Sequence, residues 1–294
     1  MNSNPIRILL LLIGIFFCAS AIIFIKASAI HPVLLAALRL LAAMLFLLPL
    51  FLRDLKKEPM PVSRCLKNSL IPGLFLGIHF ITWLIAARMT NAANASLIVN
   101  LAPVVMPFIL IALVHERVNR LEIIGTAAAL GGTMVLFGSD FKISPDYFLG
   151  DILCFISMIF FTIYLALGRR RRPYKSIWLY VVPIYAAAGV GTLLISLCFV
   201  NPLTEPWSMH EALLLLGLAA LPTVFGHSIL NWAMTHMRGQ LVSIMNMGQF
   251  IFAGIMAYFI FREIPAKEFL PASALVIGGA LLALKGAQQT EHQS

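Results

Sequence analysis

Two stretches of the chain carry the same pattern of small residues: residues 127–132 read AAALGG, and residues 274–279 read ALVIGG. The stretches lie 147 positions apart, and the same offset aligns three further pairs: Ser96 with Ser243, Glu116 with Glu263, and Arg120 with Lys267. Chance explains one such match, but matches in the same order along two apolar regions indicate an internal repeat. The offset therefore predicts two related halves, residues 1–142 and residues 143–294.

The composition indicates which environment surrounds these halves. Of the 294 residues, 61% are hydrophobic and 11% are charged, and the mean hydropathy is +0.94. A soluble domain of this length has no core large enough for so many apolar side chains, whereas a lipid bilayer solvates them. The basic residues behind the formal charge of +9 lie mostly in short loops between apolar runs, which favours membrane topology over nucleic-acid binding.

Ten apolar runs are candidates for membrane-spanning helices, which need about 20 residues each. They are residues 6–26, 32–52, 69–88, 93–114, 121–138, 148–168, 177–199, 212–234, 239–261 and 269–285. Each half contains five runs, and because five is odd, the second half enters the membrane from the opposite side. The sequence therefore predicts an all-α integral membrane protein of ten transmembrane helices in two inverted five-helix repeats. Inverted repeats place a pseudo-two-fold axis in the membrane plane, a geometry typical of transporters.

The distribution of lysine and arginine predicts the orientation. With the N-terminus in the cytoplasm, 15 of the 21 basic residues fall on the cytoplasmic side, including five within residues 53–67 and five within residues 169–175. Positive residues accumulate in cytoplasmic loops of membrane proteins. We therefore expect a multi-pass protein of the inner membrane with both termini in the cytoplasm.

Several short motifs are spread over nearly the whole chain. In the first half they are ALR at residues 37–39, AARMTNAANAS at 86–96, LAP at 101–103, ERV at 116–118, and the glycines Gly125, Gly131 and Gly132. In the second half they are NWA at residues 231–233, FRE at 261–263 and GG at 278–279. Together these motifs resemble the EamA-like branch of the drug/metabolite transporter superfamily. The chain departs from the family with FC at residues 17–18, where Trp-Gly is common, and QF at 249–250, where Glu-Pro is common. These departures bear on the substrate more than on the fold.

The resemblance implies a central cavity lined by helices 1, 3, 4, 6, 8 and 9, and an exporter in preference to an importer. On the fourth run, Ser96, Asn100, Pro103 and Pro107 recur at helical spacing and form one polar, proline-bearing stripe. Such a stripe faces protein or water and not lipid. It is consistent with a cavity wall that exposes backbone carbonyls, and equally with a proline kink that serves helix packing.

Polar side chains on the third and eighth runs form two further candidate sites. His79 and Trp83 lie four residues apart, as do His227 and Asn231, so each pair shares one helix face. Phe80 and Trp83 offer rings for stacking on a substrate. The histidines suit contact with the substrate or with a coupling proton, and an interhelical hydrogen bond explains them as well.

The remaining substrate-binding candidates are amides, hydroxyls and one phenol. They are Ser243, Asn246 and Gln249 on the ninth run, and Tyr164 on the sixth. Amides hold a polar or zwitterionic ligand by hydrogen bonds without selecting its charge.

Six residues are candidates for structural or gating roles. They are Arg39, Lys26, Glu116, Glu263, Gly132 and Gly279. Arg39 lies within the second run, where a cation needs a carboxylate, carbonyls or water, and Lys26 extends toward the membrane surface from the end of the first run. The neighbours Arg117 and Arg262 favour local ion pairs for Glu116 and Glu263. The glycines permit close helix approach, either inside the bundle or in a homodimer.

The sequence offers little support for enzymatic chemistry. Residues 115–116 read HE, but Asn119 stands where a zinc-protease motif requires its second histidine. We expect no catalytic residues, no metal and no cofactor. The sequence predicts a secondary transporter of a small polar metabolite such as an amino acid. A facilitator of other metabolites or drugs is the alternative, and a membrane scaffold or sensor is the alternative without transport.

Overall fold

The computed structural model describes residues 5–58, 60–90, 95, 98–137, 143–169, 175–262, 264 and 267–293, and within these ranges the regular structure is helical. The first part contains α1 (Pro5–Ala19), α2 (Ala21–Ala27), α3 (Pro32–Lys57), α4 (Val62–Met89), α6 (Ala102–Val114) and α7 (Arg120–Phe137). The second part contains α8 (Pro145–Arg169), α9 (Trp178–Ser196), η1 (Pro202–Thr204), α10 (Met209–Leu218), η2 (Ala219–His227), α11 (Ser228–His236), α12 (Gly239–Asn246), α13 (Gln249–Phe261) and α14 (Phe269–Gln293).

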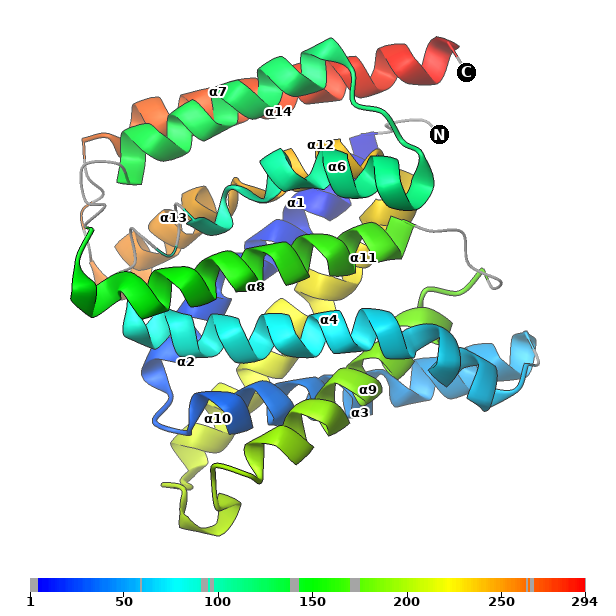
Figure 1. The fold of residues 1–294 in the computed structure, drawn as a ribbon, viewed down its shortest axis with the longest axis vertical. Coiled ribbons are helices and arrows are strands. Elements are labelled where there is room, and N and C mark those ends of the chain that lie inside the picture. Colours follow the sequence, from blue (N-terminus) through cyan, green and yellow to red (C-terminus); the bar gives the residue numbers. More distant parts are fainter. Residues whose placement is uncertain are drawn as a thin grey trace.

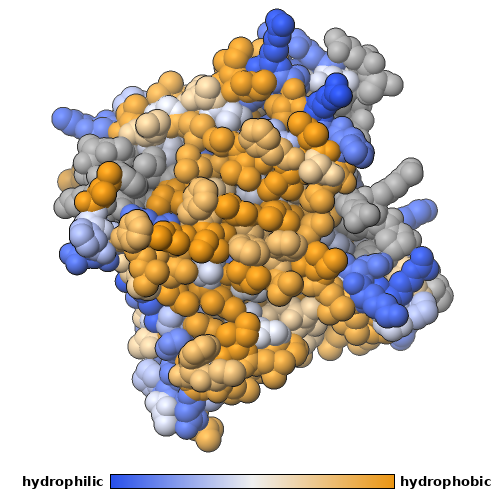
Figure 2. All heavy atoms as spheres, viewed as in Figure 1, coloured by the Kyte–Doolittle hydropathy of each residue, from blue (hydrophilic) through white to orange (hydrophobic). Residues whose placement is uncertain are grey.

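Eight helical segments of the described chain are long and apolar enough to cross a membrane. They are Pro5–Ala27, Pro32–Lys57, Val62–Met89, Pro145–Arg169, Trp178–Ser196, Met209–His236, Gly239–Ile260 and Phe269–Thr290. Figure 2 shows a broad apolar surface across the middle of the molecule, with hydrophilic residues gathered toward its edges. The predicted all-helical, multi-pass membrane class is therefore confirmed.

The fourth predicted run differs from the observed helix. We expected one helix over residues 93–114, whereas a turn at Asn100 and Leu101 separates the helical residues Ile98 and Val99 from α6. α6 begins at Ala102, and Pro103 occupies its first turn. Proline suits the start of a helix, where its missing N–H needs no partner. The ninth run breaks in the same way at Met247 and Gly248, between α12 and α13.

Two further irregularities interrupt otherwise continuous spans. A turn at Ser20 separates α1 from α2, and the Ser20 hydroxyl donates a 2.7 Å hydrogen bond to the Phe17 carbonyl. Residues of η2 form a π-helical turn around Pro222 that separates α10 from α11. Such wide turns leave backbone and side-chain groups available for tertiary contacts.

Helices from the first part of the chain pack in pairs with helices from the second part. In Figure 1, α7 and α14 run side by side at the top, while α3 and α9 lie together at the bottom, and both pairs are in contact. A Cβ atom at Gly279 would collide with the Gly125 carbonyl, and one at Gly132 would lie 2.6 Å from the Ala272 carbonyl. The sequence left open whether these glycines serve the bundle or a dimer, and in the structure they allow α7 and α14 of one chain to approach closely.

Candidate functional site

A cavity of about 160 Å³ lies between helices from both halves of the chain. Its lining includes six of the predicted substrate-binding residues, His79, Phe80, Trp83, Asn100, His227 and Gln249. It also includes Arg39 and Lys26, for which the sequence favours structural or gating roles. At about 30 Å³ per water molecule, a volume of this size holds roughly five waters, which matches a small metabolite.

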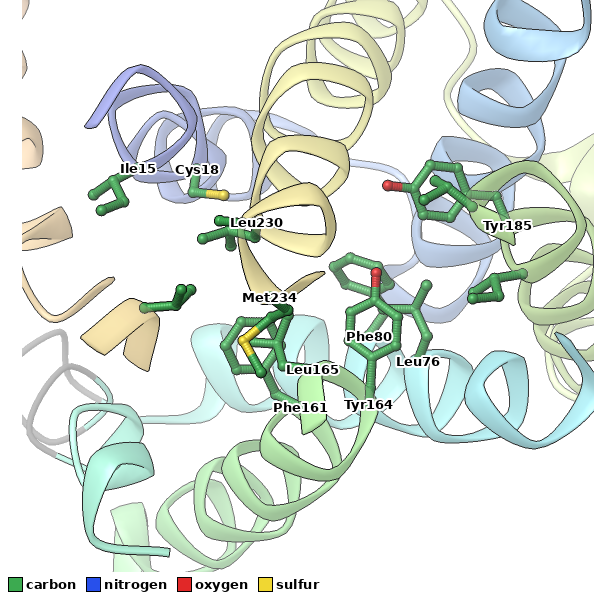
Figure 3. Packing of buried hydrophobic residues seen from close by; sticks show 14 of the residues in the cluster. Ile15, Cys18, Leu76, Phe80, Phe161, Tyr164, Leu165, Tyr185, Leu230 and Met234 are labelled. Atoms are coloured by element: carbon green, nitrogen blue, oxygen red, sulfur yellow. The ribbon is translucent and has the colours of Figure 1, made fainter. Parts of the chain in front are cut away.

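Aromatic rings form the wall around the two histidines. The His79 and His227 ring centroids are 6.3 Å apart, and the Phe80 centroid lies 5.0 Å from His227. Phe161 of α8 approaches both histidines, at 4.8 Å from His79 and 5.8 Å from His227. Figure 3 shows Phe80 and Phe161 on the side of α4 and α8 that faces α11. An apolar or aromatic part of a ligand would therefore contact rings on several sides.

The two histidines differ in their hydrogen bonding. His79 Nδ1 lies 2.8 Å from the Ser157 hydroxyl and 3.1 Å from the Ser157 carbonyl, so α8 fixes its ring. The Nδ1 atom of His227 is buried and has no hydrogen-bond partner among the described residues. Of the two rings, only that of His227 therefore keeps a free Nδ1 for a ligand.

Several predicted residues lie behind the cavity wall. Asn231 is fully buried, and its amide donates hydrogen bonds to the Tyr164 hydroxyl and, at 2.8 Å, to the His227 carbonyl. Ser243 is also buried. None of these three predicted ligands, Tyr164, Asn231 and Ser243, belongs to the lining. Asn231 and Tyr164 instead support the turn that carries His227.

Amides near the helix breaks make contacts with one another and with backbone. Asn246 accepts a 2.8 Å hydrogen bond from Gln249, which itself faces the cavity. The buried Pro103 carbonyl accepts a 2.9 Å hydrogen bond from Gln240, so in this structure it binds protein. Ser96 and Glu263 lie outside the described residues.

Arg39 is held at the cavity without a carboxylate. Its Nε and Nη2 atoms donate hydrogen bonds of 3.0 and 2.8 Å to the Thr223 hydroxyl, and its guanidinium carbon lies 4.1 Å from the Phe80 ring centroid. The Thr223 hydroxyl in turn donates to the Leu218 carbonyl at 2.9 Å. The sequence analysis missed Thr223, and Pro222 was the available signal, because a helical proline frees a carbonyl one turn earlier.

At the end of the bundle that carries both chain termini (Figure 1), Glu116 forms a partly buried ion pair with Arg169. The Glu116 carboxylate lies 2.7 Å from Arg169 Nε and also accepts the Gly239 N–H at 3.0 Å. Arg169 donates to the carbonyls of Met234 and Met237 at 3.0 and 2.7 Å. We expected Glu116 to pair with its neighbour Arg117, whereas the pair links the connection between α6 and α7 to α8. The further hydrogen bonds of both side chains attach them to the turn between α11 and α12.

A second ion pair at the same end was not predicted. Arg238 Nε and Nη2 lie 2.6 and 2.8 Å from the two carboxylate oxygens of Glu122, whose side chain is fully buried. Glu122 and Asn119 also cap α7 reciprocally. The backbone N–H of each residue donates a 2.9 Å hydrogen bond to the side chain of the other. The sequence signal was the Asn119-x-x-Glu122 spacing of a capping box.

A family model and two similar proteins place these features in context. The model of the EamA-like transporter family matches twice, at residues 5–138 and at residues 148–285. The chain belongs to the EamA-like transporter family. An Archaeoglobus fulgidus protein described as an uncharacterized transporter is 24% identical over 247 residues, which are 84% of each chain. A crystal structure of another protein superposes on this EamA-like chain with a TM-score of 0.80 and 21% identity, covering 98% of this chain and 100% of the other. Membership of this family indicates a transporter.

Proposed function

We propose that this EamA-like protein is a secondary transporter of the inner membrane, which exports a small polar metabolite such as an amino acid by alternating access. The cavity carries this proposal. It is enclosed by helices of both halves, and its polar groups, including Asn100, His227 and Gln249, are accompanied by aromatic rings. Polar groups inside a membrane are costly and mark substrate pathways.

We further propose that α6 and α7 also cross the membrane, which completes ten helices in two inverted repeats. Both bounds of α13 (Gln249–Phe261) lie 147 residues after those of α6 (Ala102–Val114). Two non-glycine residues of the described chain have positive φ, and these residues, His115 at 56° and Arg262 at 58°, end the two helices at the same offset. Equivalent breaks and equivalent ends support a common fold for the two halves.

The contact between α7 and α14 supports a two-fold axis between the halves. A Cβ at Gly132 would meet the Ala272 carbonyl, and a Cβ at Gly279 would meet the Gly125 carbonyl. The 147-residue offset converts the first pair into the second, because Gly132 aligns with Gly279 and Gly125 with Ala272. Reciprocal contacts of this kind are characteristic of a two-fold interface.

The topology predicts that two exposed positions lie on opposite sides of the membrane, which cysteine labelling can test. In a Cys198→Ser background, which removes the exposed native cysteine, Ile143→Cys is expected to react in whole cells with a membrane-impermeant maleimide. Arg117→Cys, between α6 and α7, is expected to react only after the cells are opened. Reaction of Arg117→Cys in whole cells at the rate of Ile143→Cys would contradict a membrane-spanning α6.

Alternating access is supported by a difference between the two ends of the bundle: the cavity extends toward one end, and ion pairs link helices at the other. The lining extends from Arg39 to Lys26 and Ala87, near the ends of α2 and α4. At the opposite end, the pairs Glu116–Arg169 and Glu122–Arg238 tie α7, α8 and α12 together. We infer that these pairs close the cytoplasmic side and that their opening admits substrate from the cytoplasm.

Flux through reconstituted protein tests the proposed function. Proteoliposomes are expected to show saturable uptake of a labelled amino-acid mixture, and Gln249→Leu is expected to raise the KM about three- to tenfold by removing a cavity hydrogen-bond group. Phe259→Leu, on the exposed side of the same helix, serves as the matched control with wild-type flux. Saturable flux of amines or nucleosides only would favour the alternative facilitator, and the absence of flux for every class would favour a scaffold or sensor.

A further inference from the structure

The charged side chains of the cavity lining are basic. It includes Arg39 and Lys26, and it includes no aspartate or glutamate among the described residues. The ion pairs of the described chain are Arg53–Asp54, Glu116–Arg169, Glu122–Arg238 and Lys267–Glu268, and Arg39 takes part in none of them. A buried charge is costly unless it is paired and hydrogen-bonded. The cavity therefore favours a ligand that brings negative charge.

The guanidinium of Arg39 is oriented but not saturated. The residue is 1% exposed, Thr223 accepts from Nε and Nη2, and the Phe80 ring covers one face. The Nη1 atom is buried and has no hydrogen-bond partner among the described residues. Two contacts thus fix the group in position while leaving one pair of donor hydrogens available.

His227 supplies a second unsatisfied atom in the same lining. Its Nδ1 is buried without a partner in the described chain, while its backbone carbonyl holds Asn231. A neutral imidazole carries one acceptor nitrogen, and which nitrogen this is depends on the tautomer. Arg39 Nη1 and His227 Nδ1 together offer a cationic donor and a potential acceptor within one small cavity.

We propose that Arg39 binds the carboxylate of the transported substrate and that the substrate class is small α-amino carboxylates. The substrate carboxylate accepts from Arg39 Nη1, its ammonium group donates to His227 Nδ1, and its side chain contacts the rings of Phe80 and Phe161. A phosphate needs more donors than one free guanidinium nitrogen offers, so a monoanion fits better. This inference rests on the proposed transport function and gives Arg39 a direct binding role in addition to a structural one.

Matched ligands test the inference without any change to the protein. The experiment measures uptake of a labelled mixture of the common amino acids by wild-type proteoliposomes. Unlabelled L-leucine, L-methionine and L-phenylalanine are added as competitors, and the inhibition by each acid is compared with the inhibition by its primary amide. Each amide keeps the ammonium group and the side chain but lacks the negative charge. We expect the best of the three acids to compete about ten- to a hundredfold more strongly than its amide, the range for a hydrogen bond between charged groups.

Variants of two arginines on α3 separate binding from folding. Arg39→Gln is expected to reduce the ratio of acid to amide affinity to near one, and Arg39→Lys to retain part of the preference. Arg53→Gln is the matched control, because the Arg53 side chain is 52% exposed and lies outside the cavity lining. A purely structural role for Arg39 would lower the amount of active protein without changing the ratio.

The outcomes distinguish this inference from the proposed function. Saturable uptake with equal competition by acids and amides would overturn the carboxylate site and leave the transporter in place. Saturable uptake of amines or nucleosides without competition by amino acids would have the same effect. Absence of saturable uptake for all three classes would overturn the transport function itself, and with it the substrate class.

Discussion

Replacing Glu122 by glutamine is expected to lower the free energy of unfolding by about 3–5 kcal/mol, because it leaves Arg238 as a buried charge without its carboxylate. Both side chains are almost fully shielded, at 0% and 10% exposure, and they make two contacts of 2.6 and 2.8 Å. Glutamine keeps an oxygen that accepts the Asn119 N–H, so the substitution removes charge while preserving the helix cap. The measurement is the thermal midpoint of the purified protein in detergent, with an expected decrease of the order of 10 °C.

An exposed ion pair provides the control for this prediction. Glu268→Gln removes the partner of Lys267, whose side chain is 92% exposed, and exposed pairs contribute about 0–1 kcal/mol. Its thermal midpoint should therefore stay within a few degrees of the wild-type value. Equal midpoints for Glu122→Gln and the wild type would show that the Glu122–Arg238 pair contributes little to stability.

The same substitution also tests the cytoplasmic closure. If the Glu122–Arg238 pair helps to hold that end shut, its loss increases the population that is open to the cytoplasm. A cysteine at Gln249, on the cavity wall, should then react faster with an impermeant maleimide in inside-out vesicles. An unchanged reaction rate would indicate that the pair stabilises the fold without acting as a gate.

Substituting alanine for Gly279 is expected to cost about 1–3 kcal/mol, because its Cβ would collide with the Gly125 carbonyl and force α7 and α14 apart. A Cβ at the neighbouring Gly278 would have no atom within 4 Å, so Gly278→Ala serves as the matched control. Alanine has a higher helix propensity than glycine by about 1 kcal/mol. Gly278→Ala should therefore be neutral or slightly stabilising.

Thermal midpoints of the two glycine variants, measured side by side in detergent, decide this prediction. The midpoint of Gly279→Ala should fall below the wild-type value, and that of Gly278→Ala should not. Gly131 and Gly132 repeat the contrast on α7, because only Gly132 approaches its partner helix. Equal midpoints for the members of each pair would contradict the close packing of these helices.

Much of the fold was predictable because it depends on local sequence. The hydropathy of each run determines whether it is stable in lipid, so the membrane class followed from composition and spacing. The helix expected over residues 93–114 is instead broken by a turn at Asn100 and Leu101, because hydropathy does not register a turn. Asn100 and Pro103 do signal such a turn, but proline is also tolerated inside membrane helices.

The candidate site was predictable only in part. Residues such as His79 and Trp83 share one helix face, and helical spacing was enough to predict that they lie together. Tyr164 and Asn231 were also expected at the substrate, but they bond to each other behind the wall. Spacing along one helix determines a shared face, whereas the depth of a side chain depends on the neighbouring helices.

The sequence by itself determined that this chain lies in a membrane, that a residue pattern recurs in it after 147 positions, and which residues are too polar to face lipid. Only the tertiary structure decided which of those residues meet: Arg39 with Thr223, Glu116 with Arg169, and Glu122 with Arg238. The partners in these pairs lie between 53 and 184 positions apart. Hydropathy and helical periodicity act over one or two turns, so contacts between distant helices are decided by how the whole bundle packs.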